Sequence, residues 1–443
     1  MNSDHPDLES FQQIFEGAAS DQGAKTFSVP VVRHLLAGCK SCQSQTRQAW
    51  FRGVPQDAAA AYQHAFQKPV DEACHTEAQS NLERDQATLL LRDLLAEPRH
   101  RQEILVQNSH RFHTWQLAEL LLQESQEIRL DSPLPALHLA NLSVLVAGRL
   151  KTRYPQALVE DLLGRAYSEK GNIQRVLGDP QGAAASLSEA DAHLTAGTND
   201  PLDRARLLSF EASLHSDRGE YATAVQKLRV AARTYRSMDD VHQVGRTLIQ
   251  SGINIGFLED YEGAIRLLAL GLQRIDTERE PRLVLIARHN LIHYLNEAGR
   301  TRQALTLLHK TRPMYEEMGD HLSLARMNWL EGNIALALGN LDEAESALIK
   351  AQEGLLAQGV QLEAMMVCLD LAQILVLEKR TTELRRLTQE MIPIFESRDL
   401  RVRAFEAFIL FHKAVEAEAL TLGLIKDLAR TLRRERGREP MRR

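Results

Sequence analysis

Cysteine, proline, glycine and aromatic residues are all scarce in this 443-residue chain, and each shortage excludes a class of protein. Four Cys cannot form a disulfide framework for so long a chain, which favours a reducing compartment. Aromatic residues make up 5%, and 14 Pro and 24 Gly are few, so a β-rich fold and a disordered chain are disfavoured. No apolar run reaches about 18 residues, and residues 1–13 contain no apolar signal segment. We therefore expect a cytoplasmic protein that makes no contact with a membrane.

The charge balance excludes a strongly basic or acidic protein. Lys and Arg number 53 and Asp and Glu 59, which gives a formal net charge of −6. That balance disfavours nucleic acid and membrane surfaces as partners of the whole chain. Apolar residues at 44% and charged residues at 25% are ordinary for a globular protein.

An internal repeat of about 40 residues is the strongest signal present. Five segments align on a turn between two predicted helices, and a sixth unit keeps the same spacing. The turn residues are Gly178, Gly219, Glu259, Gly299, Gly339 and Lys379. Five residues later the first five units have Ala183, Ala224, Ala264, Ala304 and Ala344, whereas the sixth has Leu384. The glycines predict a left-handed backbone at the turn that ends the first helix of each unit.

Apolar residues recur at helical spacing on both sides of each turn, which predicts a pair of amphipathic helices per unit. A small residue precedes the turn by seven positions in five units, where paired helices should approach most closely. These residues are Gly171, Ala212, Gly252, Gly332 and Ala372. The fourth unit has Ile292 there, so its packing should differ. One helix pair cannot bury its apolar face alone, so neighbouring pairs must stack into a solenoid.

The pattern resembles the tetratricopeptide repeat in its turn glycine and its small residues before and after the turn. The resemblance covers about 157–400, and the longer period implies longer helices than the usual repeat of about 34 residues. It implies an all-α fold, a right-handed superhelical solenoid of helix pairs. It also implies a protein or peptide partner, although the same repeat serves many unrelated complexes.

We expect four parts along the chain. Residues 1–75 form a helical segment with Cys and His, and 76–156 form a helical region with a degenerate repeat at 115–130 and 134–150. Residues 157–400 form six repeats. Residues 401–443 form a capping helix pair and an Arg-rich tail.

The tetratricopeptide resemblance implies that ligand contacts come from the first helix of each pair, at fixed positions. Carried over residue by residue, these are Arg165, Asn172, Arg175, Arg206, Ser213, Arg246, His289, His293, Asn296, Arg326, Trp329, Asn333 and Gln373. Arginines can bind carboxylates through paired hydrogen bonds, and amides can hold a peptide backbone. This set predicts a groove for an acidic or extended peptide. The alternative is that the arginines only bridge neighbouring helices through Asp and Glu.

A separate Cys/His pattern lies near the N-terminus. His34, Cys39 and Cys42 have spacing suited to a tetrahedral zinc ion, with His5, Cys74 and His75 as alternatives for the fourth ligand. Four protein ligands leave no open position, so the zinc would be structural rather than catalytic. The alternative is two small, partly buried cysteines without metal.

This segment resembles the zinc-binding anti-sigma fold, whose pattern is His-x3-Cys-x2-Cys after an upstream His or Cys. The present spacing has one extra residue between His34 and Cys39. The resemblance implies His5, His34, Cys39 and Cys42 as zinc ligands. It also implies an alternative function, in which residues 1–75 bind a sigma factor.

Signatures of catalysis are missing: the sequence has no phosphate-binding Gly-rich loop, no His-Glu-x-x-His and no Gly-x-Ser-x-Gly. His289 and His293 share a helix face, but a polar lining is a better interpretation than a metal site, and Cys368 should lie in the core. We therefore expect a scaffold of bacterial signalling or transcriptional regulation that binds proteins and is not an enzyme. Nucleic-acid binding through the zinc segment and the tail at 429–443 is a further alternative, weakened because the tail has no aromatic residue.

Overall fold

The computed structural model describes residues 44–46, 48, 86–318 and 320–396, and a few residues between 412 and 429. The chain divides into two compact units, Met1–Gln86 and Ala87–Arg443. In the first unit, the described residues at 44–46 and 48 are helical. The helices α5 to α19 all lie in the second unit.

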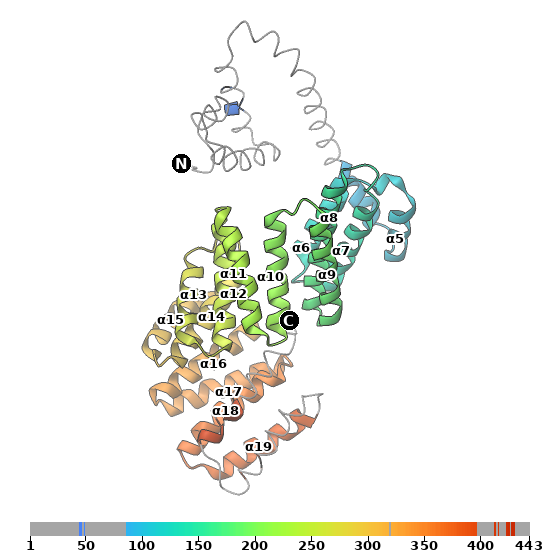
Figure 1. The fold of residues 1–443 in the computed structure, drawn as a ribbon. Coiled ribbons are helices and arrows are strands. Elements are labelled where there is room, and N and C mark those ends of the chain that lie inside the picture. The colour runs from blue at the N-terminus through green and yellow to red at the C-terminus, as the bar shows by residue number, and fades with distance from the viewer. Residues whose placement is uncertain are drawn as a thin grey trace, which may run out of the picture. The chain divides into compact units, whose positions relative to one another are not determined.

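Helices account for all the regular structure described in the second unit, so the all-α prediction is confirmed there (Figure 1). After a helix that reaches residue 95 come α5 (Arg99–Asn108), the short 3₁₀ helix η1 (His110–Phe112), α6 (Trp115–Ile128) and α7 (Pro133–Gly148). The repeat follows as α8 (Gln156–Val176), α9 (Pro180–Ala196), α10 (Pro201–Asp217), α11 (Tyr221–Ser237), α12 (Val241–Phe257) and α13 (Tyr261–Leu272). It continues as α14 (Pro281–Glu297), α15 (Thr301–Met318), α16 (His321–Leu338), α17 (Leu341–Ala357), α18 (Gln361–Leu377) and α19 (Thr381–Glu396).

The predicted turn residues all adopt the left-handed backbone that ends the first helix of a pair. Their φ angles are 78° at Gly178, 75° at Gly219, 66° at Glu259, 75° at Gly299, 83° at Gly339 and 57° at Lys379. Glu259 and Lys379 therefore take a conformation that disfavours a side chain. The regular spacing in the sequence reflects this one backbone requirement, repeated six times.

Close approach of the paired helices explains the small residues before the turn. A Cβ on Gly332 would lie 2.6 Å from the side chain of Leu348 and 3.3 Å from the carbonyl oxygen of Ala344. A Cβ on Gly171 would similarly lie 2.8 Å from Leu187. In the fourth pair Ile292 is fully buried, and α14 and α15 pack less closely than α8 and α9. The expected difference in packing is therefore present.

Aspartates begin several of these helices. Asp200, Asp240 and Asp320 accept backbone N–H groups at the starts of α10, α12 and α16. Asp179 and Asp260 do the same for α9 and α13. These caps satisfy N–H groups that have no partner inside the helix, and they fix where each helix starts.

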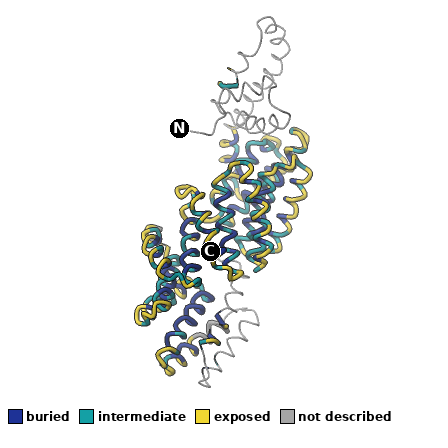
Figure 2. Tube along the Cα trace, turned by 60° about the vertical axis from the view of Figure 1, so that its left-hand side comes forward, coloured by how far each residue is buried: buried dark blue, intermediate teal, exposed yellow. Residues whose placement is uncertain are grey.

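The core consists of clusters of buried side chains between consecutive helices, as Figure 2 shows by the buried stripe along the stack. α18 is buried along most of its length, and Cys368 within it is 1% exposed, so its core position is confirmed. None of the helices described here is both long and apolar enough to cross a bilayer.

Candidate functional site

We call the first helices of successive pairs the first-helix face: α6, α8, α10, α12, α14, α16 and α18. α8 contacts both α6 and α10, and α14 contacts both α12 and α16, which in turn contacts α18. Successive second helices share no comparable contacts within the described residues. The thirteen predicted site residues all lie on the first helices.

Each predicted arginine of this face is paired with a carboxylate from another part of the array. Arg165 holds Glu119 of α6 through two hydrogen bonds of 3.0 and 2.5 Å. Arg326 holds Glu363 of α18 through two bonds of 2.8 Å. These contacts fit the second interpretation of the sequence, in which the arginines bridge neighbouring helices through Asp and Glu.

The remaining arginine pairs are less complete. Arg206 lies 3.3 Å from Glu169 of α8, and Arg246 lies 2.6 Å from Glu280 at the start of α14. Arg175 donates to Asp217 of α10 at 2.8 Å. All these bonds connect different first helices or their ends, so the arginines help to hold successive pairs in register.

Burial and ion pairing shift the arginine pKa values in different directions. Burial works to lower the pKa of Arg165, but Glu119 outweighs it and the pKa is raised. The same competition, with Glu363 as partner, raises the pKa of Arg326. For Arg246 burial prevails over the nearby Glu280, and the pKa is lowered. Burial thus outweighs ion pairing at Arg246, whereas ion pairing outweighs burial at Arg165 and Arg326.

A polar network joins α16 to α18. Trp329 Nε1 donates to Asp370 Oδ2 at 2.7 Å, and Gln373 Nε2 donates to Asp370 Oδ1 at 3.0 Å. In the amide orientation that satisfies both neighbours, Asn333 donates to Asp370 at 3.0 Å and accepts from Trp329 at 3.1 Å. Asp370 is 4% exposed and was not among the predicted residues. The sequence predicted three residues around this carboxylate but not the carboxylate itself.

The other predicted residues make local contacts. His289 Nδ1 lies 2.9 Å from the hydroxyl of Tyr315, and His293 packs against the ring of Tyr294. Asn172 accepts from Arg175. Two further residues complete the set: Ser213 donates to the Ser209 carbonyl, and Asn296 donates to the carbonyl of Asn333 at 3.4 Å.

Two asparagine oxygens on this face have no hydrogen-bond partner in the described structure. They are Oδ1 of Asn254 on α12 and Oδ1 of Asn296 on α14. Asn254 is 4% exposed and its Nδ2 donates to the carbonyl of Gln250. Asn254 was not predicted, because it lies two positions after Gly252 and outside the family's contact register.

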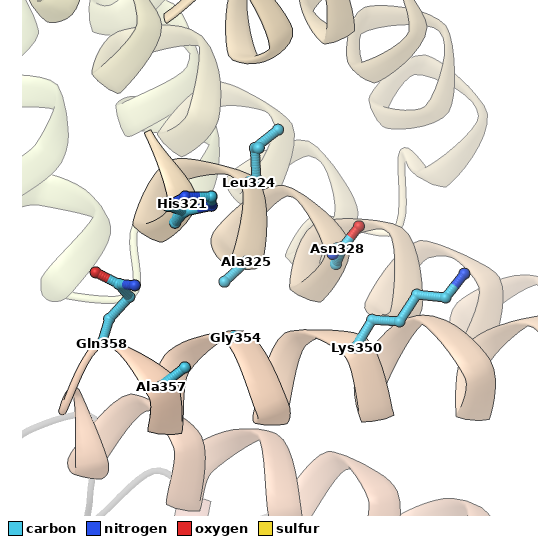
Figure 3. A pocket seen from close by; sticks show the side chains of 8 residues that line it. All are labelled: His321, Leu324, Ala325, Asn328, Lys350, Gly354, Ala357 and Gln358. Atoms are coloured by element: carbon cyan, nitrogen blue, oxygen red, sulfur yellow. The ribbon is translucent and has the colours of Figure 1, made fainter. Parts of the chain in front are cut away.

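A depression of about 350 Å³ lies elsewhere, between the two helices of one pair (Figure 3). It is lined by His321, Leu324, Ala325, Asn328, Lys350, Gly354, Ala357 and Gln358. It contains none of the predicted site residues.

The predicted zinc ligands His5, His34, Cys39 and Cys42 lie outside the described residues, as does most of the Arg-rich tail. Within the part of the chain that is described, no group of three or more His, Cys, Asp or Glu side chains could hold a metal ion. The zinc prediction, and with it the anti-sigma and nucleic-acid alternatives, remain predictions.

The arrangement of helices is similar to that of proteins with solved structures. A Rap protein in complex with competence and sporulation factor superposes with a TM-score of 0.55 at 13% identity, over 71% of this chain and 87% of that one. The apo form of RapI gives 0.53 at 13% identity, over 70% and 85%. The fold is similar to that of Rap proteins. No protein-family model and no curated protein sequence matches the chain.

The likeness to Rap proteins confirms the helix-pair repeat of tetratricopeptide type. At 13% identity it concerns the fold, and it assigns no ligand to any residue of the first-helix face.

Proposed function

We propose that the first-helix face binds an extended peptide or a segment of another protein, as part of bacterial signalling or transcriptional regulation. The protein acts by binding and not by catalysis. The observation that carries the proposal is the pair of unpartnered amide oxygens, Asn254 Oδ1 and Asn296 Oδ1, on neighbouring first helices. Each is buried in the described structure and still has capacity to accept a hydrogen bond.

An extended peptide suits these oxygens chemically. Its backbone presents N–H donors at regular intervals, and an amide oxygen accepts them readily. A buried acceptor left unpaired costs about 1–3 kcal/mol, which a ligand N–H would recover. Two such acceptors on adjacent helices therefore favour a ligand with repeated donors.

The proteins of similar structure support the proposal that the chain binds a peptide or protein segment. One Rap protein of similar fold was crystallised with competence and sporulation factor, so a helix-pair array of this kind can hold a bound factor. For the present chain the partner is proposed from its own side chains: amides and arginines on the first helices, which suit a peptide backbone and acidic groups.

A selection experiment tests the proposal. The full-length protein is incubated with a soluble library of random octapeptides, and the retained peptides are identified by mass spectrometry. We expect enrichment by the wild type, and a loss of affinity of about fivefold to thirtyfold in Asn254→Leu and Asn296→Leu, since each loses a bond worth about 1–2 kcal/mol.

Asn290→Leu is the matched control for this experiment. Asn290 lies on α14 like Asn296, but it is only half-buried and its Nδ2 donates to the Ile286 carbonyl in an exposed hydrogen bond. We expect its variant to bind like the wild type. No enrichment from the library, or equal loss in all three variants, would contradict the proposed function.

A further inference from the structure

We propose that Arg129, Arg206 and Arg246 form an anion subsite on the first-helix face that binds a carboxylate of the peptide ligand. The inference rests on the proposed function and names the chemical group recognised at this position. Arg129 was not predicted from the sequence, because it lies just after α6, outside the six repeats at 157–400.

Two of the three guanidinium groups share one carboxylate. Arg129 Nη1 lies 3.3 Å from Glu169 Oε1, and Arg206 Nη2 lies 3.3 Å from Glu169 Oε2. The Glu169 side chain is 0% exposed, so it is a fixed internal counter-ion. One internal carboxylate thus faces two guanidinium groups. Asp203 is a further carboxylate near Arg206: burial raises its pKa, and the charges of Arg165 and Arg206 oppose this rise.

The third guanidinium group has a partner of its own. Arg246 Nη1 lies 2.6 Å from Glu280 Oε1, and His242 Nε2 lies 3.0 Å from the same oxygen. His242 Nδ1 accepts the backbone N–H of Asp276 at 3.1 Å, so the imidazole is neutral with its proton on Nε2. Arg246 and Glu280 therefore cancel each other.

Electrostatic effects link the third arginine to the other two. Burial lowers the pKa of Arg246, Glu280 opposes this, and the charge of Arg129 lowers it further. Burial raises the pKa of Tyr235, while the charges of Arg206 and Arg246 both act to lower it. Arg246 therefore interacts with Arg129, and it shares Tyr235 as a neighbour with Arg206.

The cluster retains hydrogen-bond donors. A guanidinium group has five N–H donors. Within the described residues Arg129 donates to Glu169 and to the Gln126 carbonyl, while Arg206 and Arg246 each donate to one carboxylate. Their side chains are 21%, 35% and 29% exposed, so an anion can reach them.

The contrast with the rest of the face locates the subsite. Arg165 and Arg326 each hold a carboxylate through two hydrogen bonds, so their paired donors are already occupied. An anion arriving at Arg129, Arg206 and Arg246 instead gains charge-assisted hydrogen bonds from donors that no carboxylate occupies.

Two octapeptide libraries test this inference with the full-length protein. One library contains Asp and Glu and has free C-terminal carboxylates; the other lacks Asp and Glu and is amidated at the C-terminus. We expect enrichment from the first library. Replacing the critical carboxylate of a selected peptide by an amide should weaken wild-type binding about tenfold to a hundredfold.

Variants of the cluster show whether that carboxylate meets these arginines. Arg206→Lys keeps the charge but loses the planar guanidinium group. In this variant and in Arg246→Met, the same amide replacement in the peptide should weaken binding by less than about threefold. Arg204→Met is the matched control, since Arg204 lies on α10 beside Arg206 but pairs with the exposed Asp191. It should behave as wild type.

Substitution of the internal counter-ion Glu169 should strengthen peptide binding, whereas the arginine substitutions should weaken it. Glu169→Gln removes the negative charge that Arg129 and Arg206 share, so it should bind the selected acidic peptide more tightly than wild type. A purely structural role of Glu169 predicts equal or weaker binding. Thermal unfolding of each variant establishes that it is folded.

The outcomes separate this inference from the function on which it rests. No enrichment from either library would overturn both. Enrichment of neutral peptides alone, or peptide affinities unchanged by the cluster variants, would overturn the anion subsite while peptide binding stands. Carboxylate-dependent binding that the cluster variants abolish, with Arg204→Met unaffected, supports the subsite.

Discussion

Arg282, the second residue of α14, lies 3.3 Å from Asp131 in the turn between α6 and α7, although 151 positions separate them in the sequence. Both side chains are largely exposed, at 65% and 72%. The pair therefore links the start of the array to its fourth repeat.

The exposure of this pair predicts a small contribution to stability. A double-mutant cycle with Asp131→Asn and Arg282→Gln should give a coupling energy of about 0.2–1 kcal/mol by urea denaturation. The coupling should vanish in 1 M NaCl because salt screens exposed charges. A coupling that persisted in salt would show that the pair is buried.

Asp370 should matter much more to stability, since it is buried and accepts hydrogen bonds from Trp329 and Gln373. We expect Asp370→Ala to lower the free energy of unfolding by about 2–4 kcal/mol, because it leaves buried donors unpaired. Glu353→Ala, at an exposed position on α17, should change it by less than about 0.5 kcal/mol. Equal effects of the two substitutions would contradict the network.

The left-handed turn at Lys379 predicts a stabilising substitution. Lys379→Gly should raise the free energy of unfolding by about 1 kcal/mol, since glycine adopts φ of 57° without the cost of a Cβ. Gly339→Ala should lower it by about 1–2 kcal/mol, although a Cβ there would meet no atom within 4 Å. Chemical denaturation measures both, and changes of the same sign would contradict the assigned turn geometry.

The free energy of unfolding should depend on pH through Asp203, near the start of α10. Burial raises its pKa to about 6, with Arg165 opposing and Asp200 and Asp161 adding to the rise. Because the folded-state pKa exceeds the unfolded value of about 3.8, this group favours folding when protonated. Its contribution to stability therefore falls as the pH rises from about 4 to about 6 and is constant above.

The variant Asp203→Asn isolates this effect. It should be more stable than wild type above pH 6, by no more than roughly 3 kcal/mol, and the difference should shrink as the pH falls to 4. Urea denaturation of both proteins across this range measures the difference. A difference that grew toward acid pH would contradict the raised pKa.

The repeat was predictable from sequence because one backbone requirement recurs at a fixed spacing. Gly178 to Lys379 mark the end of each first helix, and the small residues mark where paired helices touch. These are local properties, so the order of residues reveals them.

The charge pairing was not predictable in the same way. Arg206 pairs backward with Glu169 and Arg246 pairs forward with Glu280, although both occupy the same position in their repeats. Partner choice depends on how one helix pair is stacked on the next. Arg129 lies outside the six aligned repeats, so only the three-dimensional arrangement brings it to the carboxylate that it shares with Arg206.

Hydrogen–deuterium exchange of the full-length protein, with and without a peptide selected from the octapeptide library, tests the central claim most directly. If the first-helix face binds the peptide, amide exchange should slow in α10, α12 and α14 and stay unchanged in α11, α13 and α15. Slowed exchange confined to the second helices would contradict the account.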